Sequence, residues 1–129
     1  MYKEIIKKAI DAKAKSYSPY SKFSVGAAVI TEDGVMYSGC NIENAAYTPT
    51  ICAERTAIFK AVSQGNRKIK QIAIIGSSSY TYPCGVCRQV IREFQSEDMD
   101  IIVANSVEDY KVFKLEELLP YSFGPEKLK

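Results

Sequence analysis

Three cysteines and one glutamate in this chain have the spacing expected of a catalytic metal centre. Cys52 is followed two residues later by Glu54, and Cys84 and Cys87 form a Cys-x-x-Cys pair directly after Pro83. Catalytic zinc is commonly held by three protein ligands, which leaves a fourth position open for water. A carboxylate that is not a ligand could then move the protons of that water. We therefore expect the three cysteines to bind zinc and Glu54 to transfer protons.

The charge of such a site predicts a role for a neighbouring arginine. Three thiolates would leave the zinc site with a net negative charge, which weakens the metal as a Lewis acid. Arg55 lies three residues after Cys52, on the same face of a helix. A guanidinium that donates to a thiolate sulfur would offset this charge, and Arg88 is an alternative for the same role. The chain contains no histidine, so Glu54 would have to carry all proton transfer.

The cysteines are expected at the starts of two helices. The first helix is expected to begin near Thr50, a suitable N-cap, and to run to Val62 before residues 63–66 end it. The second is expected to begin at Cys84 or Gly85. Helix N-termini carry partial positive charge, which favours the thiolate form of cysteine. Two helices that enter from neighbouring strands would bring the three sulfurs together.

The other segments predict a sheet between helices. The expected elements are a helix over residues 2–14, strands over 23–31 and 35–40 with a turn at 32–34, an irregular connection over 41–49, strands over 71–76, 99–104 and 110–114, and a short helix over 115–119. This alternation favours a central mixed sheet with helices packed against it. Because no repeat or linker interrupts the chain, residues 1–129 are expected to form a single domain.

The composition argues against several classes of partner. A formal net charge of +2, with lysines scattered through both halves, is too small to indicate a nucleic-acid or membrane surface. The chain has no apolar signal segment and no apolar run long enough to span a bilayer. We therefore expect a cytoplasmic protein, in which cysteines stay reduced and serve metal binding or thiol chemistry.

Four segments, in this order, closely resemble the small cytidine deaminases. The segments are Phe23–Ala28, Gly39–Ala45, Cys52–Ala57 and Pro83–Gln89. The last two match the zinc deaminase signature, with cysteine in the place of histidine and the glutamate not a ligand. The resemblance implies an α/β fold, namely a single-domain three-layer α-β-α sandwich around a mixed five-stranded sheet. It also implies Zn²⁺-dependent hydrolytic deamination of cytidine, and of 2′-deoxycytidine, to the uridine product and ammonia in pyrimidine salvage.

The same resemblance implies which residues hold the substrate, a small-molecule nucleoside. Asn41 and Glu43 would hydrogen-bond the ribose hydroxyls, and Phe23 would pack against the pyrimidine. Ala45 and Tyr47 would help to bind the nucleoside. A free nucleoside is expected because a polymer would leave the 3′ hydroxyl esterified.

Family members of this size are homotetramers whose sites are completed by a neighbouring subunit, so the resemblance implies a homotetramer here. Phe123 is a candidate for an aromatic cover donated across such an interface. The chain departs from the family pattern at Tyr82, where a small serine is usual, and at Val86, where alanine is usual. Both departures lie near the metal-binding segment and bear on substrate preference more than on the chemistry.

Three other interpretations remain open at this point. A structural zinc held by all four cysteines, including Cys40, would make the chain a binding module, although structural sites usually use two close pairs. A dithiol redox protein would explain the Cys84–Cys87 pair but not Cys52 or Glu54. Among deaminases, the substrate could instead be a related aminated nucleoside or a nucleoside-like antibiotic.

Overall fold

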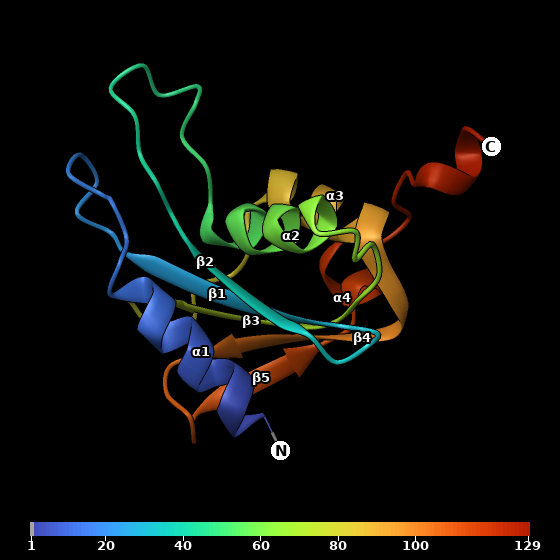
Figure 1. Ribbon diagram of the computed structural model, residues 1–129, viewed down its shortest axis with the longest axis horizontal. Helices are drawn as coiled ribbons and strands as arrows, with labels where there is room; N and C mark the ends of the chain where they lie inside the picture. Colours follow the sequence, from blue (N-terminus) through green and yellow to red (C-terminus); the bar gives the residue numbers. More distant parts are fainter. Residues whose placement is uncertain (1) are drawn as a thin grey trace.

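The computed structural model describes residues 2–129 and is organised around a five-stranded mixed sheet with the strand order β2-β1-β3-β4-β5 (Figure 1). The elements in chain order are α1 (Lys3–Lys13), β1 (Val25–Thr31), β2 (Met36–Cys40), α2 (Ala53–Ser63), β3 (Ile69–Gly76), α3 (Gly85–Phe94), β4 (Gln95–Ala104), β5 (Tyr110–Phe113), α4 (Leu115–Leu118) and the 3₁₀-helix η1 (Pro125–Lys127). Strands β3 and β4 are parallel, and the other neighbouring pairs are antiparallel. The predicted three-layer α/β fold is confirmed.

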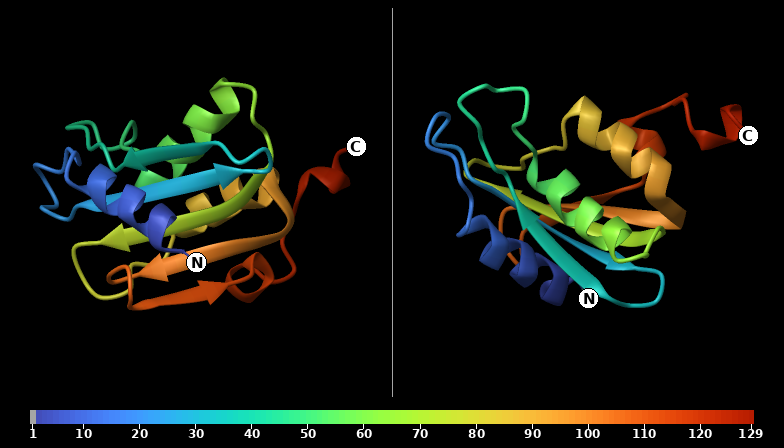
Figure 2. Two further views of the ribbon diagram at one scale, coloured as in Figure 1. Left: turned by 60° about the horizontal axis from the view of Figure 1, so that its bottom comes forward. Right: turned by 45° about the horizontal axis from the view of Figure 1, so that its top comes forward.

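The sheet is covered by helices on both faces, with α1 on one face and α2, α3 and α4 on the other (Figure 2). Alternate side chains of the central strands supply the two cores. The core against α2, α3 and α4 contains Ala27, Val29, Ile72, Ile74, Ile101 and Val103, and the core against α1 contains Ala28, Ala73, Ile75, Ile102 and Ala104. Strands that are buried on both faces carry continuous apolar runs, which is the pattern that predicted them.

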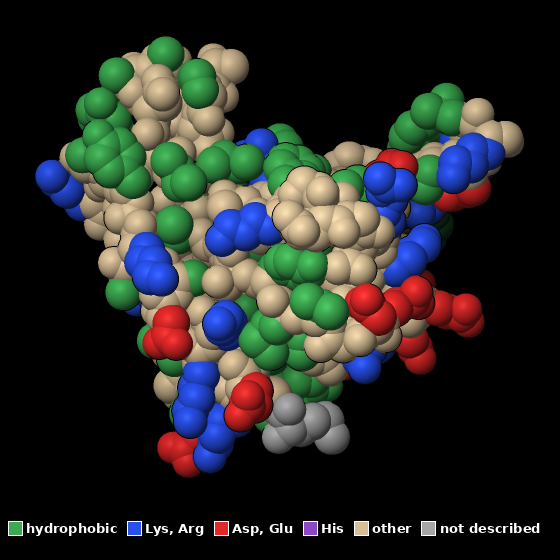
Figure 3. Space-filling view, in the orientation of Figure 1, with side chains coloured by type: hydrophobic (Ala, Val, Ile, Leu, Met, Phe, Trp, Pro, Cys, Tyr) green, Lys and Arg blue, Asp and Glu red, His purple; other side chains and the backbone are tan. Residues whose placement is uncertain are grey.

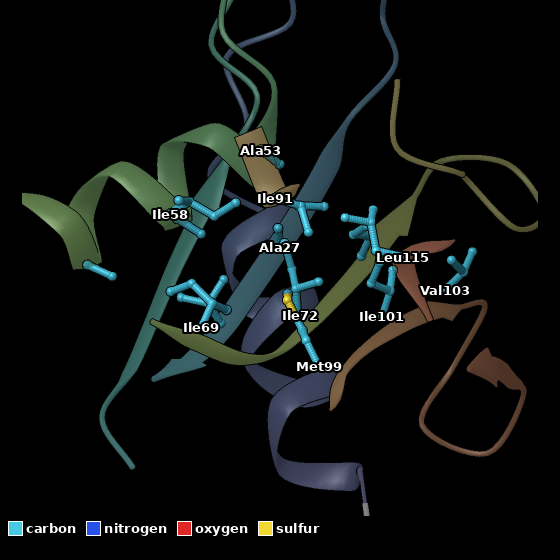
Figure 4. Packing of buried hydrophobic residues seen from close by; sticks show 14 residues of the cluster. Ala27, Ala53, Ile58, Ile69, Ile72, Ile91, Met99, Ile101, Val103 and Leu115 are labelled. Atoms are coloured by element: carbon cyan, nitrogen blue, oxygen red, sulfur yellow. The ribbon is translucent and has the colours of Figure 1, made fainter. Parts of the chain in front are cut away.

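Side chains from the three helices that cover the larger core meet over β3. Figure 4 shows Ile58 of α2, Ile91 of α3 and Leu115 of α4 gathered around Ile72. Because these helices share one packed core, their ends are fixed relative to one another. The site that they carry is therefore held by the interior of the protein.

Strand direction brings the starts of α2 and α3 to one edge of the sheet. Gly26 of β1 pairs with Cys40 of β2 on one side and with Ile75 of β3 on the other. Strands β2 and β3 therefore run in the same direction and end at the same edge of the sheet, on either side of β1. The chain leaves both strands at this edge and then enters a helix that returns across the sheet.

Gly39 allows α2 to pack directly on β2. A Cβ atom at this position would lie 2.5 Å from the backbone nitrogen of Ala57. The absence of a side chain therefore sets the depth at which α2 rests on the sheet, and with it the position of the residues at the start of the helix.

Several predicted boundaries were wrong. The N-cap of α2 is Cys52, and the Thr50 hydroxyl instead accepts a hydrogen bond from the backbone N–H of Asn44, 3.0 Å away. Strand β4 begins at Gln95, directly after α3, four residues earlier than expected. The 3₁₀-helix η1 was not predicted, because its sequence contains no apolar periodicity. Within residues 2–129, no helix combines the length and apolar character needed to cross a membrane.

Candidate metal centre

The sulfurs of Cys52, Cys84 and Cys87 lie within 4.8 Å of one another. The Cys52 and Cys84 sulfurs are 3.8 Å apart. Tetrahedral zinc with Zn–S bonds of about 2.3 Å places its sulfurs about 3.8 Å apart, so the observed cluster fits this ion. No other group of histidine, cysteine or carboxylate side chains within residues 2–129 meets the same geometric requirement.

The two helix starts position these sulfurs directly. Cys52 is the N-cap of α2 and Cys84 is the N-cap of α3, both with extended backbone. Cys87 lies in the first turn of α3, and its backbone N–H donates to the Cys84 sulfur at 3.5 Å. The sulfur of Cys84 thus occupies the position of a capping oxygen, where free N–H groups and the helix dipole favour negative charge.

Arg55 donates from Nη2 to the sulfur of Cys52 at 3.3 Å. This hydrogen bond raises the pKa of Arg55, and the guanidinium remains charged. Hydrogen bonds from Cys87 and Arg55 lower the pKa of Cys52, even though burial acts in the opposite direction. A fixed positive charge therefore lies against the sulfur cluster, at the spacing that the sequence indicated.

Arg88 hydrogen-bonds backbone carbonyls and not the sulfurs, which differs from the alternative role that the sequence suggested for it. Its Nε donates to the carbonyl of Pro83 at 2.7 Å, and its Nη1 donates to the carbonyl of Leu118 at 2.6 Å. The guanidinium points toward backbone carbonyls because these two segments converge beside α3. Arg88 therefore contacts the metal-binding loop at the backbone carbonyl of Pro83.

Glu54 is buried, with 4% of its surface exposed, in the first turn of α2. Burial raises the pKa of Glu54 to about 7, and the negative charge of Cys52 acts in the same direction. A carboxyl that titrates near neutrality can accept a proton and return it. The structure therefore places a buried carboxyl with a near-neutral pKa close to the sulfurs of Cys52 and Cys87.

The side chains of Asn41 and Glu43 connect two loops at the sheet edge. Asn41 Oδ1 accepts from the backbone N–H of Val25 at 2.9 Å, and its Nδ2 donates to the carbonyl of Phe23 at 2.8 Å. Glu43 accepts from the backbone N–H of Ser21 at 3.1 Å and from the hydroxyl of the same residue. Both side chains organise the polypeptide locally and retain hydrogen-bonding capacity for a ligand.

The other residues that are expected to bind the substrate differ in their exposure to solvent. Phe23 is half-buried, whereas Ala45 and Tyr47 are exposed on the loop between β2 and α2, which projects from the sheet in Figure 1. Phe123 is 56% exposed on the C-terminal segment, which projects at another end of the molecule. The chain alone therefore does not bring all five substrate residues and Phe123 into one enclosed site.

A group of contacts around the metal-binding loop was not predicted. The backbone N–H of Tyr80 donates to Oδ1 of Asn105 at 2.7 Å, and the Tyr80 hydroxyl bonds the carboxylate of Asp109. The ring of Tyr82 packs edge-on against Phe113, with 5.7 Å between centroids. These contacts join the loop to β5 and the β4–β5 turn. The partners are separated by about thirty residues along the chain, so no local pattern could have indicated them.

Surface shape alone does not identify the site. A hollow of about 270 Å³ lies next to the expected ribose-binding residues and is lined by Tyr20, Ser21, Glu43, Asn44, Tyr47 and Thr50. A larger hollow of about 520 Å³ lies near Arg92, Lys114 and Glu126 and contains none of the predicted site residues. The smaller hollow is relevant because it adjoins the predicted residues, whereas the larger one has mixed charge and no reactive group.

The fourth cysteine lies outside the sulfur cluster. The thiol of Cys40, at the end of β2, donates to the carbonyl of Lys15 at 3.4 Å. Cys40→Ser should therefore retain the zinc content of the parent, whereas Cys87→Ser should lose zinc because it removes one of three thiolates. Metal content per chain, measured by mass spectrometry after dialysis, tests both variants. Zinc loss from Cys40→Ser would support a four-cysteine structural site instead.

Comparison with known proteins gives matches along nearly the whole chain. The family described as "Cytidine and deoxycytidylate deaminase zinc-binding region" matches residues 1–104. A cytidine deaminase of Sporosarcina psychrophila is 47% identical over 97% of this chain and 93% of its own length. One of Halalkalibacterium halodurans is 44% identical over 96% of this chain and 95% of its own length.

Solved structures give the same relationship. The crystal structure of cytidine deaminase from Burkholderia pseudomallei has a TM-score of 0.89 and 40% identity, covering 95% of this chain and 99% of that one. The cytidine deaminase from Mycobacterium tuberculosis has a TM-score of 0.83 and 35% identity, covering 95% and 97%. With the sulfur cluster in place, these matches show that the chain belongs to the zinc-binding cytidine and deoxycytidylate deaminase family.

Proposed function

We propose that this protein deaminates cytidine and 2′-deoxycytidine, consuming water and producing uridine or 2′-deoxyuridine and ammonia. The observation that carries the proposal is the convergence of three sulfurs and a buried carboxylate at the starts of α2 and α3. Relatives named cytidine deaminase, at up to 47% identity among those compared, support the choice of substrate.

The ligands of the ion in this proposal are Cys52, Cys84 and Cys87. Zinc, when bound, would supply the Lewis acidity that makes water a nucleophile at neutral pH. Three thiolates reduce this acidity because they donate negative charge to the ion. The guanidinium of Arg55, which donates to Cys52 at 3.3 Å, offsets part of that charge and keeps the site electrophilic.

Glu54 carries the proton transfers. Its carboxylate accepts a proton from the attacking water and delivers it to N3 of the cytosine ring. It then takes the proton of the new C4 hydroxyl and passes it to the amino nitrogen, so that ammonia leaves C4 and the C4 carbonyl forms. One carboxylate suffices for these steps because it acts first as a base and then as an acid. Its burial excludes bulk water from the exchange.

Asn41 and Glu43 bind the ribose hydroxyls in this proposal. Asn41 directly follows β2, and Glu43, two residues later, lines the hollow of about 270 Å³. Binding energy from the sugar, which is remote from C4, can orient the base. Phe23 packs against the pyrimidine, and Ala45 and Tyr47 complete the nucleoside contacts from the projecting loop.

We also propose that the active protein is a homotetramer in which Phe123 covers the site of a neighbouring subunit. Hydrophobic side chains gather on two projections of the chain, the loops beside β1 and β2 and the C-terminal segment (Figure 3). The exposed members are Tyr17, Tyr20, Ile42, Tyr47, Tyr121, Phe123 and Leu128. Apolar surface on projecting segments is typical of contacts with other subunits.

Light scattering during size-exclusion chromatography should give a mass close to four times the 14.4 kDa of one chain. Phe123→Ala should raise the KM for cytidine, because the donated ring would no longer cover the substrate. A monomer with full activity would contradict the proposed subunit arrangement but not the proposed metal site.

We place this activity in the cytoplasm and in pyrimidine salvage. All four cysteines are free thiols, which is typical of proteins in a reducing compartment. Deamination of a free nucleoside returns the base and sugar together to the uridine pool, which is the chemical step that salvage requires.

Purified protein should contain about one zinc per chain and should release ammonia from cytidine as the ultraviolet spectrum changes to that of uridine. A panel with 2′-deoxycytidine, other aminated pyrimidine nucleosides and nucleoside-like antibiotics tests the substrate class. If one of these other compounds is turned over faster than cytidine, that compound is the preferred substrate. Protein that contains no zinc and releases no ammonia from cytidine would contradict the proposed function.

Glu54→Gln should keep its zinc and lose about 10²–10⁴-fold in kcat, because the amide cannot accept the proton of water. The substitution preserves the size of the side chain, so zinc content and the melting temperature serve as controls for folding. Full activity in a zinc-loaded Glu54→Gln variant would show that another group moves the protons.

A further inference from the structure

The three candidate ligands are supported to different degrees by their surroundings. Cys87 is buried within α3, and Cys52 receives a hydrogen bond from Arg55. Cys84 is exposed and stands at the junction between an irregular loop and the first residue of α3. The position of its sulfur therefore depends on the backbone that leads into it, and this backbone needs a support of its own.

Arg88 provides a hydrogen bond at this junction. Its Nε donates to the carbonyl oxygen of Pro83 at 2.7 Å. That carbonyl belongs to the peptide group that joins Pro83 to Cys84, and a peptide group is planar. A hydrogen bond that fixes the carbonyl therefore fixes the direction of the chain as it enters Cys84.

The other end of the guanidinium is anchored in the core. Its Nη1 donates at 2.6 Å to the carbonyl of Leu118, the last residue of α4. The last carbonyls of a helix lack partners within the helix, and a cation is favourable beside them. Helix α4 is itself held by the buried side chain of Leu115, which belongs to the larger core. Arg88 thus links the Cys84 backbone to a rigid part of the protein.

We propose that Arg88 is a positioning residue for the metal centre, which holds Cys84 in ligand geometry by bridging the carbonyls of Pro83 and Leu118. It acts through the backbone, whereas Arg55 acts on the sulfur charge directly. The proposal rests on zinc being bound by the three cysteines. Without the bridge, the Pro83–Cys84 peptide can turn, and the exposed Cys84 becomes the ligand that dissociates first.

The geometry of the bridge requires arginine. A guanidinium presents several N–H groups in one fixed plane, so it can donate to two carbonyls in different directions. A lysine ammonium is a compact charge on a flexible stem, and it would satisfy one carbonyl at the expense of the other. Arg88→Lys therefore retains the charge but weakens the bridge, and Arg88→Gln removes both.

Arg92 provides a matched control on the same helix. It lies one turn further along α3, and it also joins two groups, the hydroxyl of Ser122 at 2.8 Å and the carboxylate of Glu126. Its partners belong to the C-terminal segment and not to the loop before Cys84. Arg92→Gln therefore removes a comparable tertiary contact without touching the Cys84 backbone.

The test measures zinc release from the loaded protein to a chromogenic chelator, well below the unfolding temperature. Substitution of groups that orient metal ligands typically lowers metal affinity about 10–100-fold, so Arg88→Gln should release zinc faster by a factor in this range. Arg88→Lys should show a smaller acceleration, and Arg92→Gln should release zinc at the parental rate. Release from Arg88→Gln at the parental rate, or equal acceleration by Arg92→Gln, would overturn the proposal.

A spectroscopic measurement separates positioning from general destabilisation. Cobalt(II) substituted for zinc reports ligand geometry through its visible absorption, which should change in the Arg88 variants and not in Arg92→Gln. If Arg88→Gln does not fold, the spectrum and release rate of Arg88→Lys decide the question, and parental values for both would refute the role. A parent that binds zinc but does not deaminate cytidine would contradict the proposed function and leave this inference intact.

Discussion

The gathering of three cysteine sulfurs within 4.8 Å is the constraint on which the rest of this structure depends. Three thiolates at this separation would repel one another, so the surrounding protein must compensate for their charge as well as hold the sulfurs in place. Helix N-termini under two of the sulfurs supply partial positive charge, and Arg55 supplies a full one at 3.3 Å from Cys52. The negative charge that makes the cluster difficult to assemble is the charge that a divalent cation would neutralise.

The directions of the strands in the sheet bring the three cysteines together. Because β2 and β3 end at the same edge, the two helices that follow them start at neighbouring positions. Gly39 lets α2 approach β2 closely, and α3 is fixed by the larger core through Ile91. The ligands stand on the first residues of helices, where the backbone is rigid and the dipole is favourable. The fold thus supplies geometry and electrostatics through the same elements.

The irregular part of the site is supported by contacts between distant segments. The loop before Cys84 is held by Tyr80 through Asn105 and Asp109, and its last carbonyl is held by Arg88. The partners of Tyr80 are not recognisable from spacing, because hydrogen bonds across twenty-five or more residues leave no periodic trace in a sequence. Arg88 illustrates the limit. Its place after Cys87 suggested a contact with sulfur, but the convergence of the loop with α4 directs its guanidinium to two carbonyls.

The sequence by itself determined the order of helices and strands, because their apolar periods and buried runs are local properties of the chain. It also indicated the metal-binding residues, since Cys52, Cys84 and Cys87 are cysteines spaced so that they fall at the starts of two helices. Only the tertiary structure decided that Cys52 rather than Thr50 caps α2 and that Glu54 is buried. These outcomes depend on which segments meet in space, and therefore on packing energies that no local pattern contains.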